Sequence, residues 1–184
     1  MGFRKIFEYF LAAGYIFVAA DKIVEGLTPK ERYIHITFDD GYYNNIKILP
    51  LLEEYQIPAQ VFVVTSNTLL NHRYWWDVLY EHMGMAGKNW NEIARKIELL
   101  KRWDHQRITK HLVDLIGVNV FAPNSDADRP LMPDELRTFA QHPLISIGNH
   151  TRDHVILSRV DRKIAMEQVN GAQGDLNSII GYEP

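Results

Sequence analysis

Apolar residues along this chain alternate between short continuous runs and longer stretches in which they recur every three or four positions. The continuous runs, at residues 15–19, 33–38, 59–65 and 144–148, are rich in β-branched and aromatic side chains and predict strands. The stretches between them have the spacing of amphipathic helices. Strands separated by helices favour an α/β fold built on parallel strands.

Caps and prolines set the expected limits of most helices. Asp21 begins a helix close to the N-terminus, and residues 44–55 predict another with a boundary or kink at Pro50. Pro133 opens a further helix at its first turn, and a last helix spans residues 159–180. We therefore expect helices and strands to alternate along the chain.

The longest helical stretch lies between the third and fourth predicted strands. Residues 75–119 have a helical pattern, with one apolar face at Ile93, Ile97 and Leu100 and another at Ile108, Leu112 and Leu115. Asp104 is a predicted N-cap of the second helix and Gly117 its stop. A connection of this length exceeds what one crossover helix needs. We interpret residues 72–132 as a helical insertion after the third strand, within a single domain that covers residues 1–184.

Composition supports one globular domain and narrows its partners. The chain has 184 residues, of which 46% are apolar and 23% charged, enough apolar material for a core. Its net charge of -3 gives no electrostatic reason to expect nucleic acid or an anionic membrane as a partner. The absence of cysteine excludes disulfides and thiolate sites.

The N-terminus has the outline of a short signal peptide. Arg4 and Lys5 precede an uncharged run over residues 9–20. Glu8 precedes this run and Gly14 interrupts it, and the run is too short to span a bilayer. We therefore favour a helix followed by a strand, expect no transmembrane segment, and take a cytoplasmic location only as the default.

Two polar clusters follow predicted strands. Asp39, Asp40 and Gly41 come directly after the strand at residues 33–38, and His150 and His154 follow the strand at residues 144–148. The carboxyl ends of parallel strands meet at one edge of a sheet or barrel, where ligands bind. We expect the two clusters to lie close together.

Each cluster has a chemical interpretation and a plainer one. Adjacent carboxylates repel each other unless a cation or shared proton relieves them, so Asp39 and Asp40 suggest a metal ligand beside a base. His150 and His154 can face one ion from a helix or from a tight loop, and either aspartate completes three ligands, as in catalytic sites. Alternatively, one aspartate caps the next helix and the histidines are surface or capping residues.

These motifs together resemble a known family. The segment "ITFDDGYYNN" is similar to the first motif of the polysaccharide deacetylases, the NodB-homology group of carbohydrate esterases. The segment "IGNHTRDH" is similar to their second motif, His-(Ser/Thr)-x-x-His. The flanking segments "ILPLLEEYQIPAQVFVVTS" and "WWDVL" also resemble family members, so the likeness extends over nearly the whole chain.

The resemblance implies roles for five residues. Asp39 would be the catalytic base, Asp40, His150 and His154 would bind a divalent metal, and Thr151 would support the histidine loop. The metal is usually zinc, with cobalt, iron or manganese also suited to such ligands. Family members fold as a distorted (β/α) barrel and remove N-acetyl, sometimes O-acetyl, groups from carbohydrates. The substrate implied is an acetylated carbohydrate.

The sequence departs from the family after its second motif. In the family, the second motif is followed by an Arg-x-Pro-Tyr segment that supports the oxyanion, a later Asp region and a Leu-x-His segment that bears the general acid. This sequence ends at Gly181–Pro184, before these segments. We therefore expect a partial, truncated barrel that binds metal but deacetylates poorly on its own. Its open edges and apolar faces predict self-association.

Two other functions stay open on the sequence. One is a metal-dependent amidohydrolase that acts on a small non-sugar C–N amide, and the other is a non-catalytic carbohydrate-binding or interaction fragment.

Trp75 and Trp76 either line a sugar cleft or pack inside the insertion, with packing the plainer interpretation. We expect His35 to be packed or hydrogen-bonded. The remaining histidines are expected to be solvated: His72, His82, His105, His111 and His142.

Overall fold

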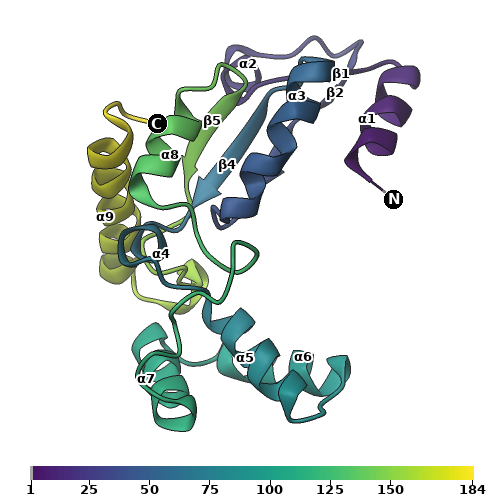
Figure 1. Ribbon diagram of the computed structural model, residues 1–184. Helices are drawn as coiled ribbons and strands as arrows, with labels where there is room; N and C mark the ends of the chain where they lie inside the picture. Colours follow the sequence, from purple (N-terminus) through teal and green to yellow (C-terminus); the bar gives the residue numbers. More distant parts are fainter. Residues whose placement is uncertain (1) are drawn as a thin grey trace.

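Short parallel strands and the helices that cover them make up this α/β fold (Figure 1). The computed structural model describes residues 2–184. Within them, β3 (Ile36–Phe38), β4 (Ala59–Val63) and β5 (Ile145–Asn149) form one parallel sheet in the order β3-β4-β5. Two further strands, β1 (Tyr15–Phe17) and β2 (Arg32–Ile34), pair in parallel beside it. The predicted α/β class with parallel strands is confirmed.

Helices separate the strands along the chain, except between β2 and β3. In order, they are α1 (Phe3–Ala12), α2 (Ala20–Glu25), the 3-10 helix η1 (Tyr43–Ile48), α3 (Leu49–Tyr55), α4 (Thr65–Leu70), α5 (Trp75–Met85), α6 (Trp90–Leu100), α7 (His105–Ile116), α8 (Pro133–Ala140), the 3-10 turn η2 (Leu157–Arg159) and α9 (Arg162–Ile180). Among the described residues, none of these helices is long and apolar enough to cross a membrane.

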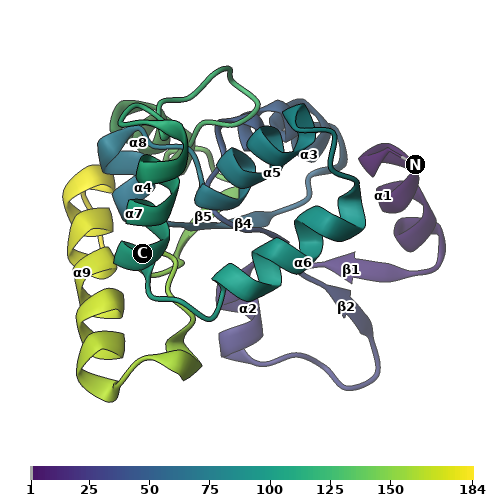
Figure 2. The same ribbon diagram turned by 90° about the horizontal axis from the view of Figure 1, so that it is seen from below.

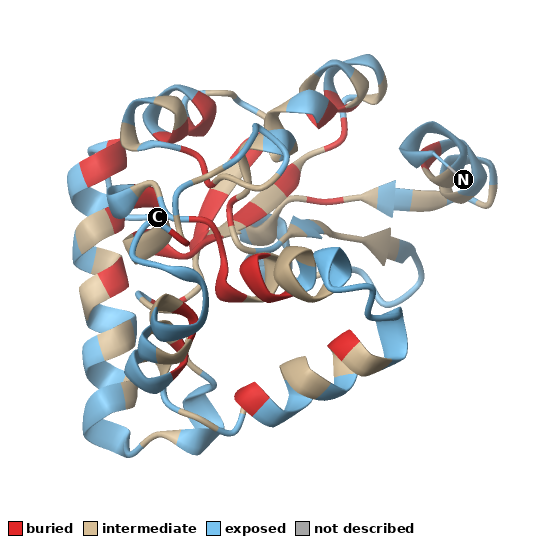
Figure 3. Cartoon of the chain, turned by 60° about the horizontal axis from the view of Figure 1, so that its bottom comes forward, coloured by how far each residue is buried: buried red, intermediate tan, exposed pale blue. Residues whose placement is uncertain are grey.

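The main core lies where the three-stranded sheet meets α3, α8 and α9. Val61 of β4 is fully buried there, as are Leu52, Leu136 and Leu176 from the three helices. Figure 3 shows buried segments, in red, along the strands and on the helix faces next to them. Burying such side chains stabilises the fold by about 1.5–3 kcal/mol each. The carboxyl edge of the sheet is therefore fixed by a well-packed core.

The prediction of a single strand over residues 33–38 is wrong, because two strands lie there. His35 separates β2, which pairs with β1, from β3, which pairs with β4. The His35 ring lies 2.9 Å from the Val18 carbonyl through Nδ1 and 3.1 Å from Gln60 Oε1 through Nε2. The side chain thus ties the two sheets together at the break, which agrees with the expected hydrogen-bonded role of His35.

The helix predicted over residues 44–55 begins as a 3-10 helix. Pro50 lies in the first turn of α3, where its missing N–H costs no hydrogen bond, and η1 precedes it. The helix boundary expected at Pro50 is therefore present, but α3 begins one residue earlier, at Leu49. Pro133 opens α8 as expected.

The helices α5, α6 and α7 form a lobe below the sheet with a second core of its own (Figures 1 and 2). Leu79, Leu100 and Leu112 are nearly or fully buried at its centre. The Asp104 side chain caps α7 by accepting a hydrogen bond from the Arg107 amide at 2.7 Å, and Gly117 ends that helix with φ 133°. Both predicted helix limits are confirmed.

The histidines outside the two motifs are less solvated than expected. His72 is exposed, but the other four are half-buried. The His142 ring lies 3.0 Å from Glu53, and the His111 ring meets the Trp103 ring edge-on at 5.3 Å. Tertiary packing of the helices covers positions whose local sequence is polar.

Candidate metal-binding site

The two sequence motifs meet at the carboxyl edge of the three-stranded sheet. Asp40 lies two residues beyond β3, and His150 lies one residue beyond β5, with β4 between these strands. The His150 amide donates to the Val63 carbonyl at 3.1 Å, which continues the β4–β5 ladder up to the first histidine. Parallel pairing thus brings side chains more than a hundred residues apart to the same point.

The backbone around Asp40 is held in an unusual conformation. Asp40 has φ 71° and Gly41 has φ 80°, both in the left-handed region. A Cβ at Gly41 would also lie 3.1 Å from both Val63 methyl groups, so glycine is required there on two grounds. The Asp40 carbonyl accepts hydrogen bonds from the Val64 amide at 3.2 Å and from the buried Tyr74 hydroxyl. These contacts fix the direction of the Asp40 side chain.

The two histidines lie in a loop rather than on one helix face, which decides between the two arrangements left open by their spacing. Thr151 and His154 have φ values of 66° and 54°. The Thr151 amide donates to Asn149 Oδ1 at 2.9 Å, and the loop carbonyl of Arg152 accepts from the Ser66 amide at 2.9 Å. The loop is thereby tied to the start of α4.

The loop brings both imidazoles to the Asp40 carboxylate. Nε2 of His154 lies 3.1 Å from Asp40 Oδ1, and Nε2 of His150 lies 3.5 Å from the same oxygen. One ligand atom from each of the three residues lies within 4.8 Å of the others. Tetrahedral zinc with bonds of about 2.0–2.1 Å requires neighbouring ligand atoms about 3.3–3.4 Å apart. The two spacings between Asp40 and the histidines are close to this value, and the donor set suits a divalent metal.

The contacts within the cluster shift the pKa values of Asp40 and His150. Burial alone would raise the pKa of Asp40, but hydrogen bonds from His150 and His154 outweigh it and lower that pKa to about 2. The hydrogen bond with Asp40 raises the pKa of His150, with a smaller contribution from the negative charge of Asp39. The carboxylate is thus ionised and draws positive charge to the point where the three side chains meet.

Asp39 and Thr151 occupy different places around this cluster. Asp39 is exposed, near enough to His150 for its charge to act there, and it is outside the group of three ligand atoms. Thr151 is buried, and its contacts come from its backbone, with its hydroxyl unpartnered among the described residues. The role predicted for Thr151 as a support of the loop stays a prediction.

A family model described as "Polysaccharide deacetylase" matches residues 26–184. The chain belongs to the polysaccharide deacetylase family. The match includes both motifs of this site, so the family expected from the sequence is confirmed. No curated protein matches the chain significantly.

Solved structures of deacetylases share this fold. The chain is similar to the Streptococcus pyogenes deacetylase PplD in complex with acetate, with a TM-score of 0.58 and 15% identity over 98% of this chain and 57% of that one. It is also similar to the BpsB deacetylase domain from Bordetella bronchiseptica, with a TM-score of 0.54 and 19% identity over 97% of this chain and 64% of that one. This polysaccharide deacetylase chain thus spans about 57–64% of the length of these two structures.

An aromatic group at the start of α5 contacts the site through His154. The Tyr74 ring stacks on the Trp76 ring at 4.8 Å and 17°, and the Trp76 ring lies 4.7 Å from the His154 ring. Trp76 Nε1 donates to the Tyr42 hydroxyl at 3.0 Å, and that hydroxyl donates to Asp77 at 2.6 Å. The run "RYWWD" contains three of its members, and Tyr42 comes from the first motif.

Proposed function

We propose that this chain is a metal-dependent deacetylase that hydrolyses N-acetyl or O-acetyl groups on a carbohydrate. The observation that carries the proposal is the meeting of Asp40, His150 and His154 beside the exposed Asp39 at the carboxyl edge of the sheet. Membership of the polysaccharide deacetylase family supports the choice of an acetylated carbohydrate as substrate.

The ion proposed for the site is a divalent metal, with zinc first and cobalt, iron or manganese as alternatives. When bound, such an ion acts as a Lewis acid toward the acyl carbonyl and toward water. The protein's part is to hold Asp40 ionised and to direct Nε2 of His150 and His154 toward its carboxylate. Thr151 would hold the histidine loop through its backbone amide.

Asp39 is proposed as the general base. Its carboxylate would accept a proton from the attacking water, and that proton would pass to the leaving amine as the C–N bond breaks. Two features support this role: Asp39 is exposed, and it is outside the group of three ligand atoms. The adjacent aspartates then have separate tasks, which relieves the repulsion between them.

Three finer points of architecture belong to the same proposal. Residues 72–132 would be an insertion, supported by the separate core of α5, α6 and α7. The strands would be part of a distorted (β/α) barrel, supported by the likeness to deacetylase structures. Self-association is supported by β3 and β5, each of which has an edge without a strand partner within residues 2–184. Light scattering that gives the mass of a monomer at all concentrations would contradict self-association.

Acetate release from an N-acetylglucosamine tetramer tests the proposed function. We expect slow release that stops when a chelator removes the metal, resumes when zinc is added, and is lost in Asp39→Asn. The Asp39→Asn protein should still bind zinc, whereas Asp40→Ala should not. Acetate release that is indifferent to the chelator would contradict the proposal. Ammonia release from small amides without acetate release from sugars would favour the amidohydrolase instead.

A further inference from the structure

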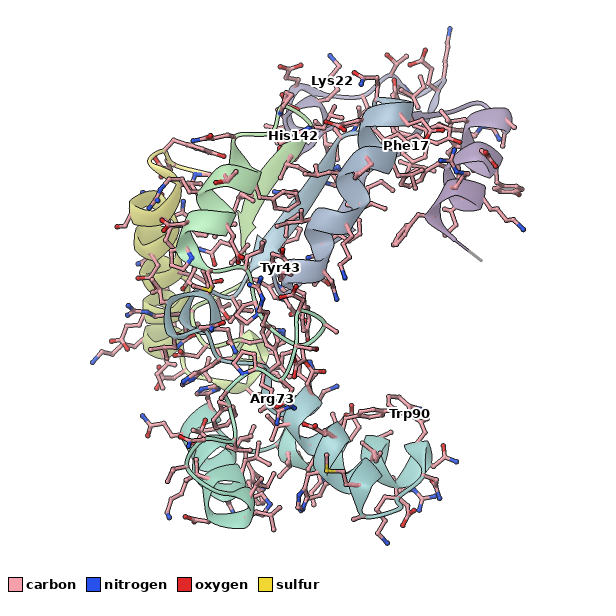
Figure 4. All side chains as sticks on the ribbon, viewed as in Figure 1. Phe17, Lys22, Tyr43, Arg73, Trp90 and His142 are labelled. Atoms are coloured by element: carbon pink, nitrogen blue, oxygen red, sulfur yellow. The ribbon has the colours of Figure 1, made fainter. Side chains whose placement is uncertain are left out.

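The histidine loop, residues 150–154, is held in a strained conformation by contacts from outside the proposed metal site. Thr151 and His154 are non-glycine residues with positive φ values of 66° and 54°. Such a conformation costs free energy and persists only where the surrounding contacts determine it. The contacts come from α4 and α9, which pack against each other next to the end of β5 (Figure 4).

One link from α9 fixes the residue that directly precedes His154. The Asp153 amide donates to Gln168 Oε1 at 2.8 Å, and Gln168 Nε2 donates back to Asp153 Oδ2 at 2.6 Å. The other carboxylate oxygen of Asp153 accepts from the Ser66 hydroxyl in the first turn of α4. The backbone and the side chain of Asp153 are therefore both fixed, and with them the point from which the His154 side chain departs.

A second link joins the middle of the loop to α9. Arg152 Nη2 donates to Asp175 Oδ1 at 3.1 Å, and Arg152 Nε lies 3.0 Å from Asp175 Oδ2, so the guanidinium is bound at two points. The buried Thr65 hydroxyl of α4 donates to the same carboxylate at 2.7 Å. Gly171 leaves room for the arginine, because a Cβ there would lie 3.2 Å from Arg152 Cδ. Asp175 thus connects the loop to α4 and α9.

The residues of α9 that contact the loop share one face of the helix. Gln168, Gly171 and Asp175 are three and four positions apart, which places them in one row along α9. A separate face packs in the main core, where Leu176 is fully buried and Ile179 is 4% exposed. Apolar packing therefore anchors α9 to the sheet, and a polar face of the same helix contacts the loop.

We propose that Gln168 and Asp175 are positioning residues, which hold the histidine loop in its metal-binding conformation before an ion arrives. The inference rests on the proposed function, because it takes His150 and His154 as ligands. Gln168 and Asp175 are outside the group of three ligand atoms, so they act through the loop. A loop ordered in advance removes the cost of ordering the imidazoles when metal binds. Partners that orient metal ligands commonly contribute about 10–100-fold in metal affinity.

The reciprocal pair of Asp153 and Gln168 supplies a disruptive variant and its rescue. Gln168→Glu keeps the size of the side chain but places a carboxylate oxygen opposite Asp153 Oδ2, where the amide donor now lies at 2.6 Å. The two like charges repel each other. The double variant Asp153→Asn/Gln168→Glu exchanges the amide and the carboxylate, so one donor again faces one acceptor. The matched control is Asn170→Asp, which adds the same charge at an exposed position of α9 that has no side-chain hydrogen bond within residues 2–184.

Metal binding and metal geometry are measured on the full chain, without acetate release. Zinc competition against a chromogenic chelator gives the affinity, and the visible absorption of the cobalt(II)-loaded protein reports the coordination geometry. Gln168→Glu should weaken zinc binding by at least about tenfold and change the cobalt spectrum. Asn170→Asp and the double variant should stay within about threefold of the wild-type affinity.

A role limited to stability gives a different result. It would lower the Tm of Gln168→Glu but leave the zinc affinity and the cobalt spectrum of the folded protein unchanged, and this outcome would overturn the inference. Equal weakening in Gln168→Glu and Asn170→Asp would also overturn it. Asp175→Asn tests the second link, because it removes the charge that binds Arg152 and keeps the size of the side chain. Zinc affinity equal to that of the wild type in this variant would contradict the role of Asp175.

The outcomes for the positioning residues and for the proposed function can be told apart. Zinc binding that is lost in Asp40→Ala but unchanged in Gln168→Glu would overturn the positioning inference alone. Weaker zinc binding in Gln168→Glu, together with no acetate release by the wild type, would support the inference and contradict the deacetylase function. No zinc binding by the wild type would overturn both.

Discussion

Replacing Tyr74 by phenylalanine would remove one buried hydrogen bond from the backbone of a proposed metal ligand. The Tyr74 side chain is 1% exposed, and its hydroxyl donates to the Asp40 carbonyl. Phenylalanine keeps the ring that stacks on Trp76 at 4.8 Å, so packing changes little. The variant therefore isolates the contribution of the hydroxyl group.

The structure sets the size of the effect. A net buried hydrogen bond contributes about 0.5–1.5 kcal/mol to stability. The Asp40 carbonyl would keep its hydrogen bond from the Val64 amide at 3.2 Å, so no buried acceptor is left without a partner. We expect a loss of about 1 kcal/mol, which lowers Tm by about 2–4 °C in a domain of this size. Zinc affinity should fall by about five- to tenfold, because groups that orient a ligand commonly contribute that much or more.

The assay combines thermal unfolding of the metal-free protein with zinc competition against a chromogenic chelator. Tyr80→Phe is the matched control, because Tyr80 lies on α5, the helix that Tyr74 directly precedes, is 53% exposed and has no side-chain hydrogen bond among the described residues. Zinc affinity that is equal in the wild type and Tyr74→Phe would refute the positioning argument. The same fall in both tyrosine variants would also refute it.

Three further predictions concern the base, the sheet edge and the protons on the ligands. Asp39→Asn should reduce acetate release by about a hundredfold or more while zinc affinity stays close to that of the wild type, and parallel losses of both would place Asp39 among the ligands. Gly148→Ala should destabilise the fold by about 1–3 kcal/mol in a denaturant titration, because the new Cβ would lie 2.5 Å from the Phe62 ring. An unfolding midpoint equal to that of the wild type would contradict this steric clash. Zinc affinity should fall as the pH is lowered through the raised pKa of His150, because the protonated imidazole cannot bind metal, and a flat affinity from about pH 8 to about pH 5 would argue against His150 as a ligand.

The sequence was sufficient to predict the meeting of the two motifs. Both lie at the ends of β-branched runs, and parallel strands bring their carboxyl ends together whatever separates them in the chain. The caps Asp104 and Gly117 were predictable for a related reason, since capping depends on residues within one turn.

The features that the sequence did not predict depend on contacts between residues far apart in the chain. The break at His35 comes from hydrogen bonds to Val18 and Gln60, and nothing in the run "YIHITF" indicates which residues those are. The link from Tyr74 to Asp40 joins residues 34 positions apart. Local spacing describes which face of a helix is apolar, but it does not identify which backbone group a buried hydroxyl will reach.

The measurement that tests the central claim most directly is an anomalous difference map from crystals grown with zinc. The claim is that Asp40, His150 and His154 bind one divalent metal at the carboxyl edge of the sheet. We predict a single strong peak about 2.0–2.2 Å from an Asp40 carboxylate oxygen and from Nε2 of both histidines. A map in which these three side chains are ordered as described and carry no peak would contradict the claim.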